Sequence, residues 1–398
     1  MRPRFSRMRK AMRAVVGSGG AAIAAEERLV AEVSAADYVF VTQYFVKGGA
    51  EKVILNYISA LIELRPSLRI AIVTTDVAPN PTWIERMPES VQLIDGSAVV
   101  GDLRNRYRRQ ILGSVMGRMS PKVIHIVNSG VGYLWVRDEA KKLKASKVRI
   151  VASLFNSDMS KGGKIRSYYH KFLPAAADVI DQVFTDNEAV IDEAVKYTKL
   201  PRKMFEVHYQ PIDLKIQKPR AIRHDKRLEV LWASRVVQQK RPDILRKIGR
   251  RLDPEKFLIT IRGEMGDGYS EAYFGGIAAI KYGGEFKSVA ELAAAKYDVF
   301  LYTSQADGVP NMLLEMMAEG MLIMAPDVGG VREIVSNKTG MLLPKFDDVG
   351  AYVAGLKKLE RERADLRERI LAGQKLLKER HSRKSFLADV KRDIVKQL

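Results

Sequence analysis

A single carboxylate interrupts an otherwise apolar stretch of the sequence. Glu315 stands between two leucines and two methionines in the run NMLLEMMAEG. The run before it, SQADGVPN, has the polar and turn-forming residues of a loop. Glu315 lies one helical turn after Asn311, so both side chains share a face of the predicted helix. Such a carboxylate either accepts hydrogen bonds from two vicinal hydroxyls of a ligand or forms an ion pair with one of the many lysines and arginines. The residues alone leave both readings open.

Two cations follow another apolar run, LWASRVVQQKRPD. Arg235 ends the predicted strand, and Lys240 lies in the loop before the next helix. An arginine fork and a lysine point charge at the end of a strand suit a diphosphate. In so basic a chain, the alternative is a pair of solvated surface side chains.

A glycine pair follows the first predicted strand. Gly48 and Gly49 in VKGGAEK let the backbone approach a ligand closely, and the helix after them points its amino end at the same place. A plain tight turn explains this stretch equally well.

The elements that position these residues alternate between strands and helices. Nearly continuous apolar runs predict strands, which indicates parallel sheets covered on both faces. Loops at the carboxyl ends of such strands bind ligands, and the loop from Asp307 to Asn311 lies at such an end. The next helix is expected over Asn311–Glu319 and ends at Gly320, which tolerates a left-handed conformation. The expected strands are 38–45, 68–76, 121–130, 148–158, 228–235, 257–263, 297–304 and 321–327.

The alternation divides into two halves. The segment from Met204 to Arg227 is polar and basic and contains Pro211 and Pro219, so it is the expected linker. The predicted organisation is a basic N-terminal arm (1–36), a first α/β domain (37–215), a second α/β domain (228–380) and a final helix (381–398). Leu356, Leu359, Leu366 and Ile370 recur at helical intervals near the end. They favour amphipathic helices packed on the domains over a coiled coil, because no heptad pattern is sustained.

The amino-acid composition limits the classes of protein to which the chain can belong. The chain has 398 residues, 46% hydrophobic and 29% charged, which indicates a soluble globular protein of two domains. The absence of cysteine excludes disulfides and thiolate metal sites and fits a cytoplasmic location. The net charge of +20 favours anionic partners such as nucleotides, anionic lipid or nucleic acid. No run reaches the roughly 18 to 20 apolar residues of a membrane span.

The first 27 residues are basic and then rich in small apolar residues. This order resembles a secretory signal, but the stretch from Gly17 to Gly20 interrupts its apolar core. A flexible basic arm, or a surface helix resting on anionic lipid, is the favoured reading.

Three stretches together resemble the sugar-nucleotide-dependent glycosyltransferases of family 4. They are GGAEKVILNY, SRVVQQKRPDIL and DGVPNMLLEMMAEGMLIMAPDVGGVREIV, in the family's order and spacing over roughly Val39 to Leu343. FTDNEAV, from Phe184 to Val190, also resembles a family segment. The resemblance implies a GT-B fold, in which two Rossmann-like domains face each other across a cleft and the last helix returns to the first domain. It also implies transfer from a nucleoside diphosphate sugar, UDP- or GDP-linked, with retention of configuration.

The resemblance also implies roles for individual residues. Glu315 matches the glutamate that holds the donor ribose, and Asp307 stands where the family places a glutamate near the reacting centre. Arg235 and Lys240 match the pair that binds the diphosphate leaving group. The expected donor-binding residues are Glu315, Gly48, Gly49, Gly308, Asn311, Met312 and Glu333, the last of which follows the pair Gly329-Gly330. No metal or cofactor is expected, and the sequence has no D-x-D signature.

Two departures from the family pattern stand out. Asp307 is one methylene shorter than glutamate, which changes its reach towards the donor sugar. The first domain lacks a clear counterpart of the histidine that many relatives place beside that sugar, and His125 lies inside an apolar strand, as a core histidine would. The loops expected on the acceptor side offer Asn128, Ser129, Asn156 and Asp158.

Cations interleaved with aromatics mark the first domain and its arm, in MRPRFSRMRKAMR, RNRYRRQ and KGGKIRSYYHK. They favour a peripheral contact with anionic membrane. In the family that the chain resembles, such surfaces serve membrane binding near a lipid-linked acceptor, so the resemblance implies a glycan or lipid-linked acceptor in cell-surface polysaccharide or lipopolysaccharide synthesis. Other functions stay open: a GT-B protein that binds sugar nucleotide without transferring sugar, a basic nucleic-acid-binding protein, or an epimerase or phosphorylase on the same fold. No nucleic-acid-binding motif is present, so nucleic acid is not expected as a partner.

Overall fold

The computed structural model describes most of the chain. The described residues are 26–27, 29–78, 83–96, 105–155, 167–212, 215–219, 226–292, 294–363 and 366–398, without the side chains of 105–107 and 295. The N-terminal arm up to residue 25, Asn156 and Asp158 therefore lie outside the described residues, as do Lys161 to Arg166 of the third basic stretch.

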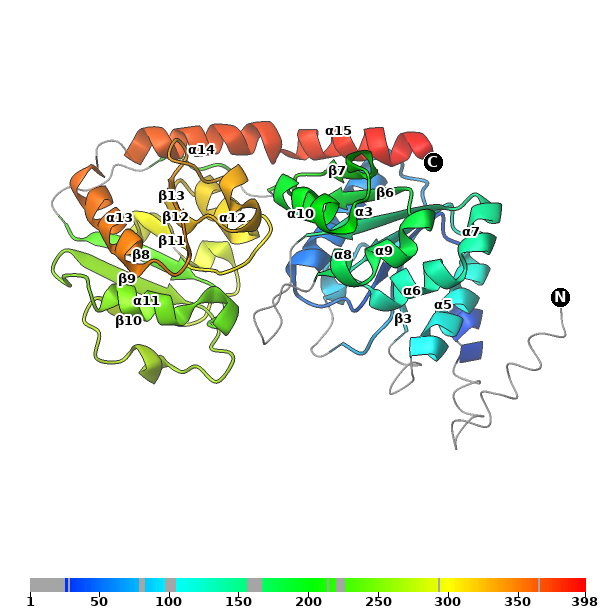
Figure 1. Cartoon of the computed structure of the whole chain (residues 1–398), viewed down its shortest axis with the longest axis horizontal. Helices are drawn as coiled ribbons and strands as arrows, with labels where there is room; N and C mark the ends of the chain where they lie inside the picture. The colour runs from blue at the N-terminus through cyan, green and yellow to red at the C-terminus, as the bar shows by residue number, and fades with distance from the viewer. Residues whose placement is uncertain are drawn as a thin grey trace.

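A seven-stranded sheet forms the first domain (Figure 1), and all its strands are parallel. Their order is β3-β2-β1-β4-β5-β6-β7, so the direction of winding reverses between β1 and β4. The strands are β1 (Tyr38–Thr42), β2 (Ile70–Thr74), β3 (Val91–Asp95), β4 (Val123–Val127), β5 (Arg149–Leu154), β6 (Gln182–Thr185) and β7 (Phe205–Val207). The helices are α3 (Gly49–Leu64), α5 (Asn105–Met119), α6 (Gly130–Asp138), α7 (Ala140–Ser146), α8 (Tyr168–Lys171), α9 (Leu173–Ala176) and α10 (Glu188–Thr198).

The two faces of this sheet bury two separate sets of apolar side chains. Val39 and Val41 of β1 pack with α5, α6, α9 and α10, whereas Tyr38 and Phe40 of the same strand pack with α3. Successive side chains of a strand point to opposite faces, so a strand buried on both sides reads as a continuous apolar run. His125 of β4 is fully buried and bonded to Tyr38 and Ser153, which confirms the prediction of a core histidine.

A six-stranded parallel sheet forms the second domain, in the order β10-β9-β8-β11-β12-β13, with the reversal between β8 and β11. Its strands are β8 (Leu228–Ala233), β9 (Phe257–Arg262), β10 (Ile280–Tyr282), β11 (Val299–Leu301), β12 (Leu322–Pro326) and β13 (Met341–Leu343). Its helices are α11 (Pro242–Gly249), α12 (Asn311–Ala318), α13 (Val349–Arg361) and α14 (Leu366–Arg380). Gly320 follows α12 with φ +78°, which is the predicted left-handed stop.

The expected linker is shorter than its sequence suggests. Strand β7 lies inside the segment from Met204 to Arg227 and pairs with β6, so the first sheet continues to Val207. Two short strands of apolar and polar residues, FEV in β7 and IKY in β10, lack the long apolar run that predicts a strand. Each lies at an edge of its sheet, where such a run is not needed.

The last helix, α15 (Arg383–Asp393), returns to the first domain. Figure 1 shows α14 over the second domain and α15 over the first, almost in line along one side of the molecule. Phe386, Val390 and Ile394 are fully buried in the apolar layer that also contains α3. The expected fold, including the returning helix, is therefore confirmed. Leu356, Leu359, Leu366 and Ile370 are also buried, as amphipathic packing predicts.

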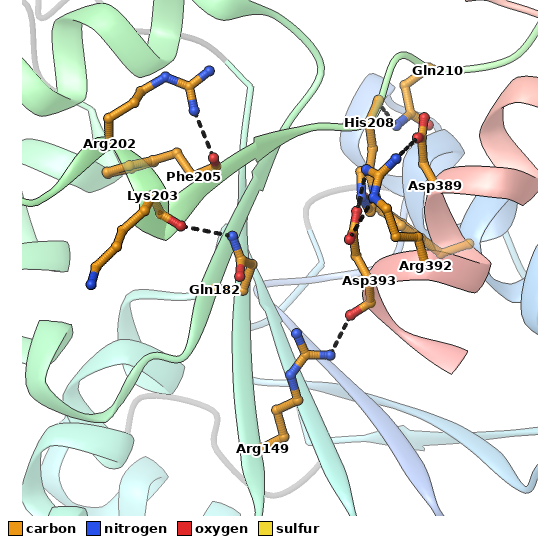
Figure 2. A network of polar contacts seen from close by, with 11 residues as sticks. Arg149, Gln182, Arg202, Lys203, Phe205, His208, Gln210, Asp389, Arg392 and Asp393 are labelled. Atoms are coloured by element: carbon orange, nitrogen blue, oxygen red, sulfur yellow. Dashed lines mark hydrogen bonds and ion pairs between the residues drawn. The ribbon is translucent and has the colours of Figure 1, made fainter. Parts of the chain in front are cut away.

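Polar contacts fix α15 where the chain leaves the first sheet (Figure 2). His208, directly after β7, is fully buried and bonded through Nε2 to Asp393 Oδ2 (2.9 Å) and through Nδ1 to the Tyr57 hydroxyl (2.9 Å). Arg149 donates to the backbone carbonyl of Asp393 (2.5 Å). His381 is bonded to the Gln210 carbonyl (2.8 Å), so the chain segments leaving and re-entering the first domain are tied together.

None of the helices within the described ranges combines the length and the apolar composition that a bilayer crossing demands.

Candidate functional site

The expected donor residues gather at the winding reversal of the second sheet. Because β8 and β11 are adjacent, the loop after β8 with Lys240 meets the loop after β11 with Asp307. Gln239 donates to the Ala306 carbonyl (2.9 Å), and the Ser304 hydroxyl donates to the Gln239 carbonyl (3.3 Å). Ligands of open parallel sheets bind in the crevice that such a reversal creates.

Asp307 is held by three donors on one of its oxygens. The Lys240 ammonium, the Tyr302 hydroxyl and the Ser304 hydroxyl (3.1 Å) all reach Asp307 Oδ2. Burial, and then the charge of Asp307, raise the pKa of Tyr302, so its hydroxyl remains protonated and donates. Oδ1 of Asp307 has no hydrogen-bond partner among the described residues and stays available to a ligand.

The two cations expected to bind a diphosphate differ in exposure and in whether they already have an acidic partner. Lys240 is partly buried and occupied by Asp307. Arg235 is exposed, and within the described parts of the chain its guanidinium has no hydrogen-bond or ion-pair partner. Arg235 is therefore ready to take an anion, whereas Lys240 must share its charge between Asp307 and that anion.

Glu315 is partnered across the domain boundary. Its Oε1 accepts from Lys52 Nζ (2.8 Å), and only 22% of the lysine side chain and 17% of the glutamate side chain are exposed. The ion pair that the sequence left open as an alternative is thus present in this structure. Oε2 has no hydrogen-bond partner within the described ranges, so the carboxylate keeps an acceptor for a hydroxyl.

The glycine loop of the first domain lies against the amino end of α12. A Cβ added at Gly49 would be 4.0 Å from the Asn311 side-chain amide. Glu51 folds back beneath this loop, so a Cβ added at Gly48 would clash with its Oε2. Burial raises the pKa of Glu51. Gly48 and Gly49 thus lie where a ligand on α12 would meet the first domain.

Gly308 and Glu333 contact the first domain directly. A Cβ at Gly308 would clash with the Phe155 carbonyl and crowd the Asn187 amide, so no larger residue fits there. Glu333 Oε1 accepts from the backbone of Ala189 (3.1 Å), in the first turn of α10, and Oε2 accepts from the Tyr209 hydroxyl (3.0 Å). Both oxygens of Glu333 are therefore used between the domains, which makes it an interdomain contact in this structure. Met312 packs at the edge of the apolar layer around α12.

The acceptor-side residues lie at the reversal of the first sheet, after β4. Asn128 adopts the left-handed conformation (φ +49°), and its carbonyl accepts from the Tyr168 hydroxyl (2.6 Å). Ser129 is fully buried; it caps α6 through Gly132 N (2.9 Å) and bonds the Thr75 hydroxyl (2.8 Å). The Ser129 hydroxyl is thus occupied in shaping the loop, and its expected place on the acceptor side stays a prediction.

Sequence reasoning missed several residues of this site. Lys52, Asn187 and Tyr209 contact the expected residues from distant parts of the chain, and Tyr302 does so from directly after β11. Only Asn187 carried a local signal, because an asparagine before an apolar-periodic run predicts a helix cap, and its Oδ1 does accept from Val190 N (2.8 Å).

In the part of the chain that the structure describes, no three His, Asp or Glu side chains come together in an arrangement that suits a metal ion.

Comparison with known proteins agrees with this geometry. Residues 227–362 match the family model described as "Glycosyl transferases group 1", which covers the second sheet. None of the curated proteins matches the chain at a significant level.

Solved structures share the fold over nearly the whole chain. The structure is similar to that of Anabaena HepE in complex with UDP (TM-score 0.70, 14% identity, covering 90% of this chain and 100% of that one). It is also similar to the lipopolysaccharide outer core galactosyltransferase WaaB in its apo form (TM-score 0.70, 17% identity, 91% and 100%). Sucrose-phosphate synthase from Thermosynechococcus elongatus gives a TM-score of 0.71 at 12% identity, over 90% and 98%. The fold is therefore GT-B, and the match to the group 1 model is confined to the second domain.

Asp186, beside Asn187, is a buried carboxyl whose protonation affects the stability of the fold. It is buried, accepts from the Asn187 amide (2.6 Å) and lies near the charges of Glu333 and Asp307. Burial raises its pKa to about 7. The folded protein therefore binds this proton more tightly than the unfolded chain, whose carboxyl titrates near 4. The resulting stability is complete below pH 4 and is lost as the pH rises towards 7.

We expect Asp186→Asn, which keeps the shape and stays neutral, to remove this pH dependence. The wild type should lose stability relative to the variant between about pH 4 and 7, and the variant should be the more stable above pH 7. Chemical denaturation across that range measures it, with Asp192→Asn on the exposed face of α10 as the matched control. A difference that stays constant between pH 4 and 7 would contradict the buried, proton-binding state of Asp186.

Proposed function

We propose that the protein is a metal-independent, retaining hexosyltransferase of family 4. It takes a sugar from a nucleoside diphosphate sugar and transfers it to a glycan or lipid-linked acceptor. The observation that carries this proposal is the set of charges at the amino end of α12. Arg235, Lys240, Asp307 and Glu315 lie on loops and a helix that meet at the winding reversal of the second sheet. The group 1 family match over these residues supports it.

Each part of the donor has a counterpart in the site. The diphosphate meets Arg235, Lys240 and the free N–H groups of α12, whose positive dipole end favours an anion. The ribose hydroxyls donate to the unpartnered oxygen of Glu315. The sugar lies between Asp307 and the first domain, where Gly48 and Gly49 allow close approach. HepE has been solved with UDP and with UDP-glucose, which supports a UDP-linked donor, with GDP as the alternative base.

In this proposal, fixed charges of the protein stabilise the charges that develop during sugar transfer. The bond between the anomeric carbon and the phosphate oxygen breaks, and the electron pair leaves with the diphosphate. Arg235 and Lys240 stabilise the negative charge that develops there without reorganising. The acceptor oxygen attacks from the face that the diphosphate leaves, and its proton passes to the departing phosphate oxygen, so the configuration is retained. Oδ1 of Asp307 faces the cationic sugar centre.

A protein that binds sugar nucleotide without transfer is the second candidate. Asp307 is shorter than the family's glutamate, and Lys240 and Tyr302 both bond to it in this structure. These contacts also support the opposite conclusion, because they position Asp307 as firmly as a catalytic carboxylate requires.

The acceptor side suggests a location at the cytoplasmic face of a membrane. WaaB is a lipopolysaccharide galactosyltransferase, and the net charge of +20 favours anionic lipid. The described arginines of the stretch RNRYRRQ are paired internally, Arg108 with Asp76 and Arg109 with Asp138. Exposed lysines of α7 are therefore better candidates for the contact: Lys141, Lys142 and Lys144.

Nucleotide binding is expected to depend on Glu315. UDP or GDP at a hundredfold its dissociation constant should stabilise the wild type by about 2.7 kcal/mol. Glu315→Ala should abolish that stabilisation, because the ribose hydroxyls lose their acceptor. A thermal-shift panel with UDP, GDP, ADP and CDP measures it, and Glu319→Ala, one turn further along, is the control. Equal stabilisation of the wild type and Glu315→Ala would exclude the ribose role.

Sugar transfer is expected to depend on Asp307. Asp307→Asn keeps the size and removes the charge, so kcat should fall by about a hundredfold while nucleotide binding persists. Release of nucleoside diphosphate from a panel of UDP- and GDP-sugars, with and without lipid extracts as acceptors, measures it. Asp327→Asn, at the end of β12, is the matched control. A wild type that binds a donor and releases no product under any of these conditions would favour the binding protein.

Membrane association is expected to depend on anionic lipid. The protein should float with vesicles that contain phosphatidylglycerol and not with phosphatidylcholine alone. Replacing Lys141, Lys142 and Lys144 with glutamine should weaken the association, on the order of 1 kcal/mol for each lysine. Flotation that is equal with both lipids would contradict the peripheral contact.

A further inference from the structure

The amino ends of helices α3 and α12 lie close together across the domain boundary. Gly49 begins α3 and Asn311 begins α12, and the two residues nearly touch. An anion bound at α12 would therefore lie near the positive ends of both helix dipoles. The first domain would thus contribute the positive dipole end of α3 to the place where a donor diphosphate would bind.

Lys52 adds a full positive charge near the amino ends of α3 and α12. It lies in the first turn of α3, where its backbone N–H donates to the Gly48 carbonyl (3.1 Å). Its ammonium reaches over to Glu315 of α12 at 2.8 Å. Among the described residues, this is the only ion pair between a side chain of the first domain and a side chain of the second domain.

The pair leaves the carboxylate able to bind a ligand. Lys52 takes Oε1 of Glu315, and Oε2 has no partner among the described residues. A carboxylate accepts about four hydrogen bonds, so one ammonium does not saturate it. Because both side chains are mostly buried, the carboxylate is also confined to one orientation.

The charge of Lys52 affects how Glu315 interacts with an anionic donor. A nucleoside diphosphate brings negative charge to the amino end of α12, one helical turn from Glu315. An isolated Glu315 carboxylate would repel that charge, and Lys52 offsets it at short range. In the second domain, Lys240 stands beside Asp307 in the same way. Glu315 and Asp307 of the expected donor site are therefore each neutralised by a lysine, and one of the two lysines comes from the first domain.

We propose that Lys52 is a positioning residue of the donor site, which holds the Glu315 carboxylate for the ribose across the domain boundary. This inference rests on the proposed function. Donor binding then requires the two domains to be in contact, because the ribose acceptor is correctly placed only when α3 lies against α12. The opposite role, a latch that blocks Glu315 until the donor displaces Lys52, predicts the opposite effect of removing the lysine.

The test is nucleotide affinity measured by titration calorimetry. The probe is whichever of UDP and GDP stabilises the wild type. Lys52→Met keeps the length of the side chain and removes its charge, and it should weaken binding by about tenfold, equivalent to about 1.4 kcal/mol. Lys52→Arg should restore most of the affinity, because a guanidinium also bonds Glu315. In the transfer assay, Lys52→Met should raise KM for the donor and leave kcat nearly unchanged.

A double-mutant cycle separates positioning from a general effect of charge. In the Glu315→Gln background, Lys52→Met should cost little further affinity, because the charged partner that Lys52 positions is gone. The matched control is the surface pair Lys375–Glu379 of α14, where Lys375→Met removes the same charge from an exposed ion pair. That variant should bind nucleotide as the wild type does, and circular dichroism checks that every variant folds.

The outcomes are distinct. A wild type that binds neither nucleotide overturns the proposed function and this inference together. A wild type that binds, with Lys52→Met binding equally or more tightly, overturns the positioning role alone, and tighter binding establishes the latch. Equal losses in Lys52→Met and Lys375→Met would show an effect of net charge and would also overturn it.

Discussion

The packing of α15 on the first domain determines how the two domains face each other. Phe386, Val390 and Ile394 bury their side chains against the layer around α3, while α14, the helix before, packs on α12. The chain re-enters the first domain beside the segment that leaves it, and the bond between His381 and Gln210 ties the two crossings. Because every strand is parallel, each sheet has one edge of ligand-binding loops. The crossing helix brings these two edges into contact, and the candidate site depends on that contact.

Opposite charges are matched at this boundary before any ligand arrives. Lys52 holds Glu315, Lys240 holds Asp307, and Glu333 caps the amino end of α10. A buried charge is costly unless it is paired, so these contacts let several ionised groups lie close together. Arg235 remains exposed. Among the described residues its guanidinium has no partner. In the proposed function, this charge and the amino end of α12 bind the anionic part of the donor, and the paired carboxylates supply acceptors for its hydroxyls.

The sequence predicts the parts of this structure that local patterns control. Apolar runs such as those of β1 and β8 identify buried parallel strands, and the rule for strand ends then places Asp307, Arg235 and Lys240 together. Short edge strands such as β7 and β10 bury little and escape detection. Side-chain contacts escape it for a different reason. Nothing near Lys52 indicates its distant partner Glu315, and nothing around Tyr302 indicates that the loop after β11 folds back to bring Asp307 to its hydroxyl. The burial of Ser129 could not be predicted either, because it depends on neighbours that only the fold brings together.

The central claim is that a nucleoside diphosphate binds between α3 and α12 with its ribose on Glu315. A crystal structure of the protein with UDP or GDP tests it most directly. The account predicts ribose hydroxyls within hydrogen-bond distance of Glu315, Lys52 still bonded to that carboxylate, and the diphosphate against Arg235 and Lys240. A nucleotide bound elsewhere, with Glu315 contacting Lys52 alone, would contradict it.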